Sequence, residues 1–220
     1  YAVTDTCPFF AASDFILGET TCDGKKKMFE LMGRIKPLHL MHLPYDTSGG
    51  HALDFWRQEM IRLKDFLEEQ TGHAIEVQEL KRQIKLQNEV RRLLWRISRY
   101  SAAEAVPLSG LDMMTVMESK SSCYDLEAYT GLLRGLIEEL EVLSAAGISV
   151  QRKAAPRLLL TGCPVGKGSH KVLQLVEECG GVIVSMENCT GIKGQDLLVE
   201  EDTADPLQAL ARRYLQTPCS

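Results

Sequence analysis

The chain has 220 residues, of which 45% are hydrophobic and 25% are charged, and its formal net charge is −5. This composition is that of a globular protein, so it excludes a disordered tail, and the acidic balance argues against a nucleic-acid-binding protein. With no apolar run long enough to cross a membrane and no signal peptide at its start, we expect a cytoplasmic protein without a membrane partner. It begins at Tyr1 without a methionine, and we expect a fragment of a longer protein.

The first fifty residues have the pattern of a strand, a helix and a second strand. A short apolar run covers 14–18, a helix is expected from Asp23 until Gly33 ends it, and 35–43 has the composition of a strand. A strand–helix–strand unit of this length places its two strands in parallel. We therefore predict that residues 1–50 are part of an N-terminal α/β domain.

Helical spacing dominates the middle of the chain. Apolar residues recur three and four positions apart over 51–72, 75–100 and 125–146. In the second of these helices a single apolar stripe lies among many charged residues, which indicates a bundle helix or an interdomain connector with a scaffold role. We predict that residues 51–150 are a helical connecting region.

A second strand–helix–strand pattern occupies the last third. Strands are expected at 157–160 and 182–186 with a helix between them over 169–179, and a final helix follows at 205–216. The strings FILGETTCDGK and LLLTGCPVGKG share an order of apolar strand, Thr, Cys, Gly and Lys, which suggests a duplicated domain. We predict that residues 151–220 are part of a C-terminal α/β domain.

Three of the seven cysteines directly follow expected strands. Cys22, Cys163 and Cys189 lie at the carboxyl ends, where open α/β sheets bind their ligands, and each has a glycine nearby. A thiolate in such a loop is a good ligand for a soft metal, although an isolated cysteine is more often a small buried hydrophobic residue. From the residues alone, both interpretations stay open.

The other four cysteines have weaker signals. Cys7 precedes a proline and Cys219 follows one, which makes them secondary candidates for metal ligands. Cys123 and Cys179 are interpreted as structural. Zinc is disfavoured because the chain has no pair of cysteines with only two to four residues between them.

Four longer strings resemble one known family. TDTCPFFAASDFILGETTCDGKKKMFELM, LPYDTSGGHALDFW, TGCPVGKGSHKV and SMENCTGIKG are similar to the 2-hydroxyacyl-CoA dehydratase and benzoyl-CoA reductase superfamily, closest to its double-cubane-cluster and dehydratase-subunit-like branch. The resemblance implies an α/β fold of two flavodoxin-like parallel-sheet domains joined by a helical region. It covers nearly the whole chain.

The resemblance also implies an iron–sulfur site. A [4Fe–4S] cluster is held between the domains by three cysteines in this family, and Cys22 and Cys189 match two of them, while the third would lie upstream of TDTCP. In the double-cubane branch, which carries an [8Fe–9S] cluster, Cys7, Cys163 and Cys219 become further ligands.

For the activity, the resemblance implies radical dehydration of a 2-hydroxyacyl-CoA, in which one electron reduces the thioester carbonyl, the hydroxyl leaves and the electron is returned. An ATP-dependent activator iron–sulfur protein supplies that electron, and the subunit forms a homo- or heterodimer. Glu19 and His51 are candidate catalytic residues for moving protons or fixing the substrate hydroxyl. Two alternatives stay open: a double-cubane reductase of small unsaturated molecules, and a non-catalytic electron-transfer subunit.

Overall fold

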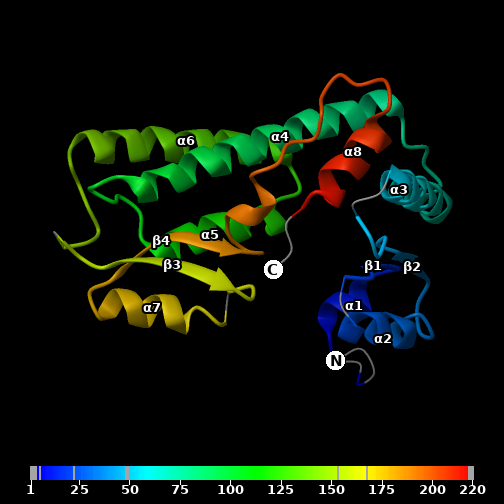
Figure 1. Cartoon of the computed structure of the whole chain (residues 1–220), viewed down its shortest axis with the longest axis horizontal. Helices are drawn as coiled ribbons and strands as arrows, with labels where there is room; N and C mark the ends of the chain where they lie inside the picture. The colour runs from blue at the N-terminus through cyan, green and yellow to red at the C-terminus, as the bar shows by residue number, and fades with distance from the viewer. Residues whose placement is uncertain are drawn as a thin grey trace. The chain divides into compact units, whose positions relative to one another are not determined.

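The computed structural model describes residue 4 and residues 6–21, 23–47, 50–152, 154–166 and 168–217. It divides into two compact units (Figure 1). The first unit joins Tyr1–Leu80 with Asp202–Leu215, and the second is built on Lys81–Glu201. The first unit therefore draws its parts from two distant stretches of the sequence.

Helices and strands alternate in both units. The first unit holds α1 (Pro8–Ala12), β1 (Ile16–Glu19), α2 (Asp23–Met32), β2 (Leu38–Met41), α3 (Gly50–Thr71) and α8 (Pro206–Leu215). The second holds most of α4 (Val77–Ser98), then α5 (Gly110–Ser119), α6 (Leu126–Ala145), β3 (Arg157–Gly162), α7 (Lys171–Glu178) and β4 (Val182–Asn188), with short 3₁₀ helices at Arg99–Ala102, Lys120–Ser122 and Ile192–Gly194.

In the first unit, β1 and β2 form a parallel pair, with Ile16 opposite Leu38. Helix α2 connects them and packs its Phe29 ring directly on Gly18, where an added Cβ would lie 2.9 Å from ring carbons. Phe10, Ile16 and Phe29 form the small core beneath this contact. The predicted parallel strand–helix–strand unit is confirmed here.

Helices α3 and α8 complete the first unit. Arg57 of α3 donates to Asp205, just before α8, with a 2.7 Å separation between the charged atoms. On the neighbouring turns of α3, Trp56 is buried, and so is the Glu59 carboxylate, which accepts from the backbone N–H of His42. The end of β2 is thereby attached to α3.

The second unit has a larger core, built from α4, α5, α6, α7 and β4. In Figure 1, α5 and the β3–β4 sheet lie between the α4–α6 pair and α7. The predicted stripe of α4 faces this core, because Val90, Leu93 and Ile97 are all buried. Helix α4 therefore packs as a bundle helix in the second unit, and its first four residues belong to the first unit.

Ion pairs connect the exposed flanks of α4 and α6 at regular intervals. They join Arg82 to Glu127, Arg134 to Glu89, and Arg96 to Glu141. The two partners are 45 residues apart in every pair, so the helices run parallel. Successive pairs are one heptad apart, the spacing at which two packed helices return to the same relative position.

Strands β3 and β4 form the second parallel pair. The ladder runs from Arg157 opposite Val182 to Gly162 opposite Asn188, with a register shift between Leu158 and Leu159. Both strands continue two residues beyond their predicted ends, up to the cysteines that follow. The strand–helix–strand order is therefore repeated, as the shared strings indicate.

The α/β class predicted for the chain is confirmed by these two parallel sheets. Flavodoxin-like domains and the boundaries at residues 50 and 150 stay predictions. Helices α1 and α5 are additions that the sequence patterns did not indicate. Within the described residues, no helix combines the length and hydrophobicity needed to span a membrane.

Candidate metal centre

Two predicted ligands leave the same edge of the second sheet. The ladder between β3 and β4 ends with Gly162 opposite Asn188, and the next residue in each strand is a cysteine, Cys163 and Cys189. Both cysteines are exposed. Since neighbouring strands are about 4.8 Å apart, the spacing of the strands brings the backbones of these two exposed cysteines close to each other at one sheet edge.

Cross-strand hydrogen bonds hold this edge on both sides of the cysteines. Before them, the Thr161 hydroxyl donates to the Glu187 carboxylate at 2.5 Å. After them, the backbone N–H of Val165 donates to the Thr190 hydroxyl at 3.1 Å. Each cysteine therefore lies in a segment that is tied to the other.

Asn188 orders the turn that carries Cys189. Its side chain is fully buried, and its Oδ1 accepts from the N–H groups of Thr190 and Gly191 at 3.1 and 2.8 Å. Gly191 is required at this turn, because an added Cβ would lie 1.9 Å from the carbonyl oxygen of Met186. The Asn188 Nδ2 has no hydrogen-bond partner among the described residues, so a buried donor remains adjacent in sequence to Cys189.

A buried lysine lies at the same edge. The Lys193 side chain is 10% exposed, and its Nζ is 2.7 Å from the Glu187 carboxylate. This hydrogen bond, with a second from Thr161, lowers the pKa of Glu187 below its ordinary value. Sequence reasoning missed Glu187 and Lys193; their closeness to Cys189 in SMENCTGIKG was the available signal.

The first unit has a cavity at the corresponding edge of its own sheet. About 620 Å³ in volume, it is lined by residues at the carboxyl ends of β1 and β2 and at the start of α2: Thr20, Thr21, Lys26, Leu40, His42, Leu43, Pro44 and Tyr45. Hydroxyl, imidazole and ammonium groups give it donors for an anionic or carbonyl-bearing ligand.

The predicted catalytic pair is not assembled around this cavity. Glu19 is the last residue of β1 and His51 lies in the first turn of α3, and both are exposed. Neither lines the cavity, although Thr20 next to Glu19 does. The catalytic roles of Glu19 and His51 stay predictions.

The remaining cysteines occupy separate places. Cys7 caps α1, since its sulfur accepts from the N–H of Phe10 at 3.4 Å, and Cys123 precedes α6. Cys179 ends α7, near the amino end of β4 and so away from Cys189. Cys22 and Cys219 lie outside the described residues.

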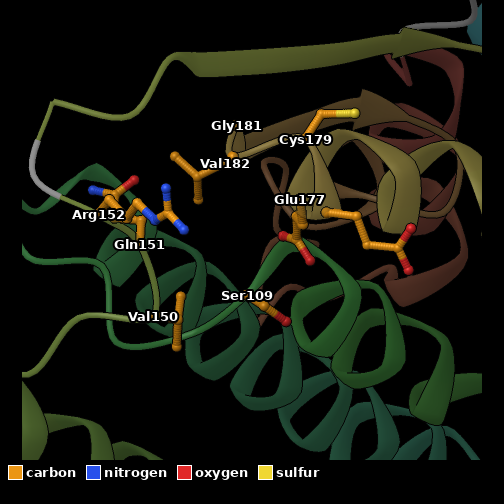
Figure 2. A pocket seen from close by; sticks show the side chains of 10 residues that line it. Ser109, Val150, Gln151, Arg152, Glu177, Cys179, Gly181 and Val182 are labelled. Atoms are coloured by element: carbon orange, nitrogen blue, oxygen red, sulfur yellow. The ribbon is translucent and has the colours of Figure 1, made fainter.

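Cys179 borders a cavity of about 250 Å³, shown in Figure 2. Ser109, Gln151, Arg152 and Glu177 also line it, and the Cys179 sulfur points away from Arg152. The Glu177 carboxylate is already used, because it accepts from the N–H of Gly110 at 2.6 Å. Among the described residues that line this cavity, Cys179 is the only cysteine.

The lysines at the start of α2 have local partners. Lys26 pairs with Asp23 and Lys27 with Glu30, all on the exposed side of the helix. Lys26 thus has a local partner and also lines the cavity at the ends of β1 and β2.

The donor set at the β3–β4 edge fits an iron–sulfur group. Thiols are the soft ligands that such clusters take, and the buried Asn188 N–H without a partner suits a sulfur acceptor. The described residues alone do not gather three or more His, Cys, Asp or Glu side chains that could hold a metal ion.

Comparisons with known proteins show the family of the chain. A family model described as 2-hydroxyglutaryl-CoA dehydratase, D-component, matches residues 1–220. A protein of Escherichia coli (strain K12) named "Putative dehydratase subunit YjiM" is 39% identical over 225 residues, which cover 100% of this chain and 57% of that protein. The chain thus spans little more than half the length of this relative.

Proposed function

Because the chain belongs to the family of the 2-hydroxyglutaryl-CoA dehydratase D-component, we propose that it is the cysteine-bearing part of an iron–sulfur subunit of a 2-hydroxyacyl-CoA dehydratase-like enzyme. The observation that supports this most is the pair of exposed cysteines, Cys163 and Cys189, at one carboxyl sheet edge. In this family, that edge is where we expect the metal ligands.

The proposed ligands are the cysteines that match the pattern of the family. Cys189 and Cys22 would hold a [4Fe–4S] cluster together with a third thiolate that is expected upstream of TDTCP. When bound, the cluster supplies low-potential one-electron transfer, with an ATP-dependent activator iron–sulfur protein as the electron source.

The chain's own residues have distinct parts in this proposal. The Asn188 N–H would donate to a sulfur ligand, and Lys193 would offset part of the negative charge that thiolates bring to the edge. The cavity lined by Thr20, Thr21 and His42 would bind a polar part of the acyl-CoA substrate. Glu19 and His51 keep their proposed roles in proton movement, in a cytoplasmic homo- or heterodimer.

A second candidate is a double-cubane reductase of small unsaturated molecules. Cys163 favours it. A single cubane with three thiolates uses Cys189 but gives Cys163, at the end of the neighbouring strand, no role. In this alternative Cys163, Cys7 and Cys219 join Cys22 and Cys189 in holding an [8Fe–9S] cluster.

Anaerobic production of the full-length protein, followed by iron and sulfide analysis, tests both candidates. About four irons per chain that disappear in Cys22→Ala and Cys189→Ala would support the single cubane, and about eight irons that also require Cys163 would support the double cubane. Cys179→Ala is the matched control, and it should retain all of its iron. Iron content that is unaffected by Cys22→Ala and Cys189→Ala would refute the proposed ligands.

A further inference from the structure

Cys163 and Cys189 each follow directly on one of two paired residues at the end of the second sheet. We propose that Cys163 and Cys189 form a reversible disulfide with each other when the chain holds no metal. This inference goes beyond the proposed function, because it concerns the metal-free chain and needs neither substrate nor partner.

Distance restraints on both sides of the cysteines carry the inference. Gly162 and Asn188 are the last partners in the ladder, and each cysteine is the next residue. The Thr161–Glu187 and Val165–Thr190 hydrogen bonds hold the two segments together before and after this point. A strand spacing of about 4.8 Å falls within the Cα separations of roughly 4.4–6.8 Å that disulfides span.

Exposure and position make the pair selective. Cys163 and Cys189 are both exposed, so a small oxidant reaches them. Cys179 is exposed too, but it ends α7 near the opposite end of β4, and Cys123 lies before α6. Of the cysteines described in the second unit, only Cys163 and Cys189 follow directly on paired strand residues.

The oxidant can be a low-molecular-weight disulfide such as glutathione disulfide. One cysteine thiolate attacks a glutathione sulfur, forms a mixed disulfide and releases one glutathione thiolate. The second cysteine thiolate then attacks the protein sulfur of the mixed disulfide, and the second glutathione leaves. Two protein thiols become one disulfide, one glutathione disulfide becomes two glutathiones, and the two protons pass to the leaving thiolates.

Oxidation of this pair would remove two thiolates from the edge that is proposed to bind iron. Metal loading of Cys189 would then require prior reduction, so the pair would protect the empty site from irreversible oxidation of its thiols.

The test uses the full-length chain, freed of metal and incubated with glutathione disulfide. Free thiols are then blocked with N-ethylmaleimide, and the digested protein is analysed by mass spectrometry. We expect a peptide that joins Cys163 to Cys189 within one chain and disappears after treatment with dithiothreitol. In Cys163→Ser, Cys189 should accumulate as a glutathione adduct, whereas Cys179→Ser should retain the cross-linked peptide.

A second variant tests the geometry. Thr190→Val removes the hydroxyl that accepts from Val165, and it should lower the equilibrium constant for the disulfide about fivefold, as expected for the loss of one hydrogen bond. Separate glutathione adducts on both cysteines, a bond from either one to Cys22 or Cys219, or a link between two chains would overturn the proposal. No iron enters this assay, so its failure is distinct from failure of the proposed function.

Discussion

Two glycines of the second unit have opposite structural requirements. Gly191 lies so close to Met186 that any Cβ collides with the backbone, whereas Gly131, in the middle of α6, has open space around the position of a Cβ. A glycine is therefore required at position 191, because no side chain fits there. At position 131 a glycine destabilises the helix, and no neighbouring atom requires it.

We predict that Gly191→Ala lowers the free energy of unfolding of the second unit by about 3 kcal/mol, because backbone atoms must shift. Gly131→Ala should instead raise it by about 0.5–1 kcal/mol through higher helix propensity. Urea unfolding of both variants gives the comparison, and a stable Gly191→Ala protein would contradict the geometry of the Cys189 turn.

His39 predicts a pH dependence for the first unit. It is buried on β2 against Phe66, its Nε2 has no partner among the described residues, and burial is the main cause that lowers its pKa from 6.5. A pKa that is lower in the folded state than in the unfolded state contributes stability above about pH 6.5, which is lost as the pH falls through the folded-state pKa.

The free energy of unfolding of the first unit should therefore decrease below about pH 6.5, and His39→Leu should remove that part of the decrease. Urea titrations above and below this pH, followed by fluorescence, measure it. Leu17→Ala, which changes an exposed residue without a titrating group on β1, is the control and should keep the wild-type dependence. An identical pH dependence in His39→Leu and the wild type would disprove the assignment.

At the scale of elements, one side chain holds an extended segment along α4. Asn88 is fully buried, its Nδ2 donates to the carbonyl of Val199 at 2.7 Å, and its Oδ1 accepts from the N–H of Val199 at 3.0 Å. Its Nδ2 also reaches Glu201. The Asn88 side chain therefore makes the two backbone hydrogen bonds that a neighbouring strand would otherwise make with Val199. These bonds hold the segment that follows the 3₁₀ helix Ile192–Gly194.

Asn88→Ala should lower the free energy of unfolding of the second unit by about 2–3 kcal/mol, because the backbone N–H and C=O of Val199 lose these hydrogen bonds. Hydrogen exchange at Val199 should accelerate in parallel with the loss of stability. Gln87→Ala, at the preceding position, serves as the matched change. Unchanged protection of Val199 in Asn88→Ala would show that other contacts hold the segment.

The ion pairs between α4 and α6 are regular, but we expect them to stabilise little. Arg96→Gln should lower the free energy of unfolding by about 0.5 kcal/mol or less, because both partners are half exposed. Leu94→Ala, on the buried side of the same helix, should cost about 3 kcal/mol. Denaturant unfolding at low and high salt separates the two effects, and a larger loss for Arg96→Gln would contradict this order.

Helices were predictable from the sequence to within about two residues, because their apolar spacing is strong and because Gly72 and Gly147 follow their ends with positive φ. The strand ends were not, since the ladder continues through Thr161, Gly162 and Asn188, which have no apolar pattern. Helix α5 was not predicted because it is only ten residues long and its buried apolar side chains are three methionines. The burial of Lys193 beside Glu187 depends on tertiary packing and has no local signal.

At the scale of the whole molecule, each unit has its own core and its own tryptophan. Trp56 is buried in the first unit, and Trp95 is part of the second. In a Trp56→Phe background, where Trp95 reports on the second unit, Val90→Ala should therefore lower the unfolding midpoint. In a Trp95→Phe background, where Trp56 reports on the first unit, Val90→Ala should leave the midpoint unchanged. Equal shifts in both backgrounds would mean that the two cores unfold together.

The return of α8 to the first unit fixes an order of events during synthesis on the ribosome. Asp205, the partner of Arg57, is made only after residues 81–201 of the second unit, some ten seconds later at elongation rates of roughly 5–20 residues per second. The strands that precede Cys163 and Cys189 are joined by one local helix and are complete by then. In the nascent chain, the cysteine edge of the second unit therefore forms while the first unit still lacks its last helix.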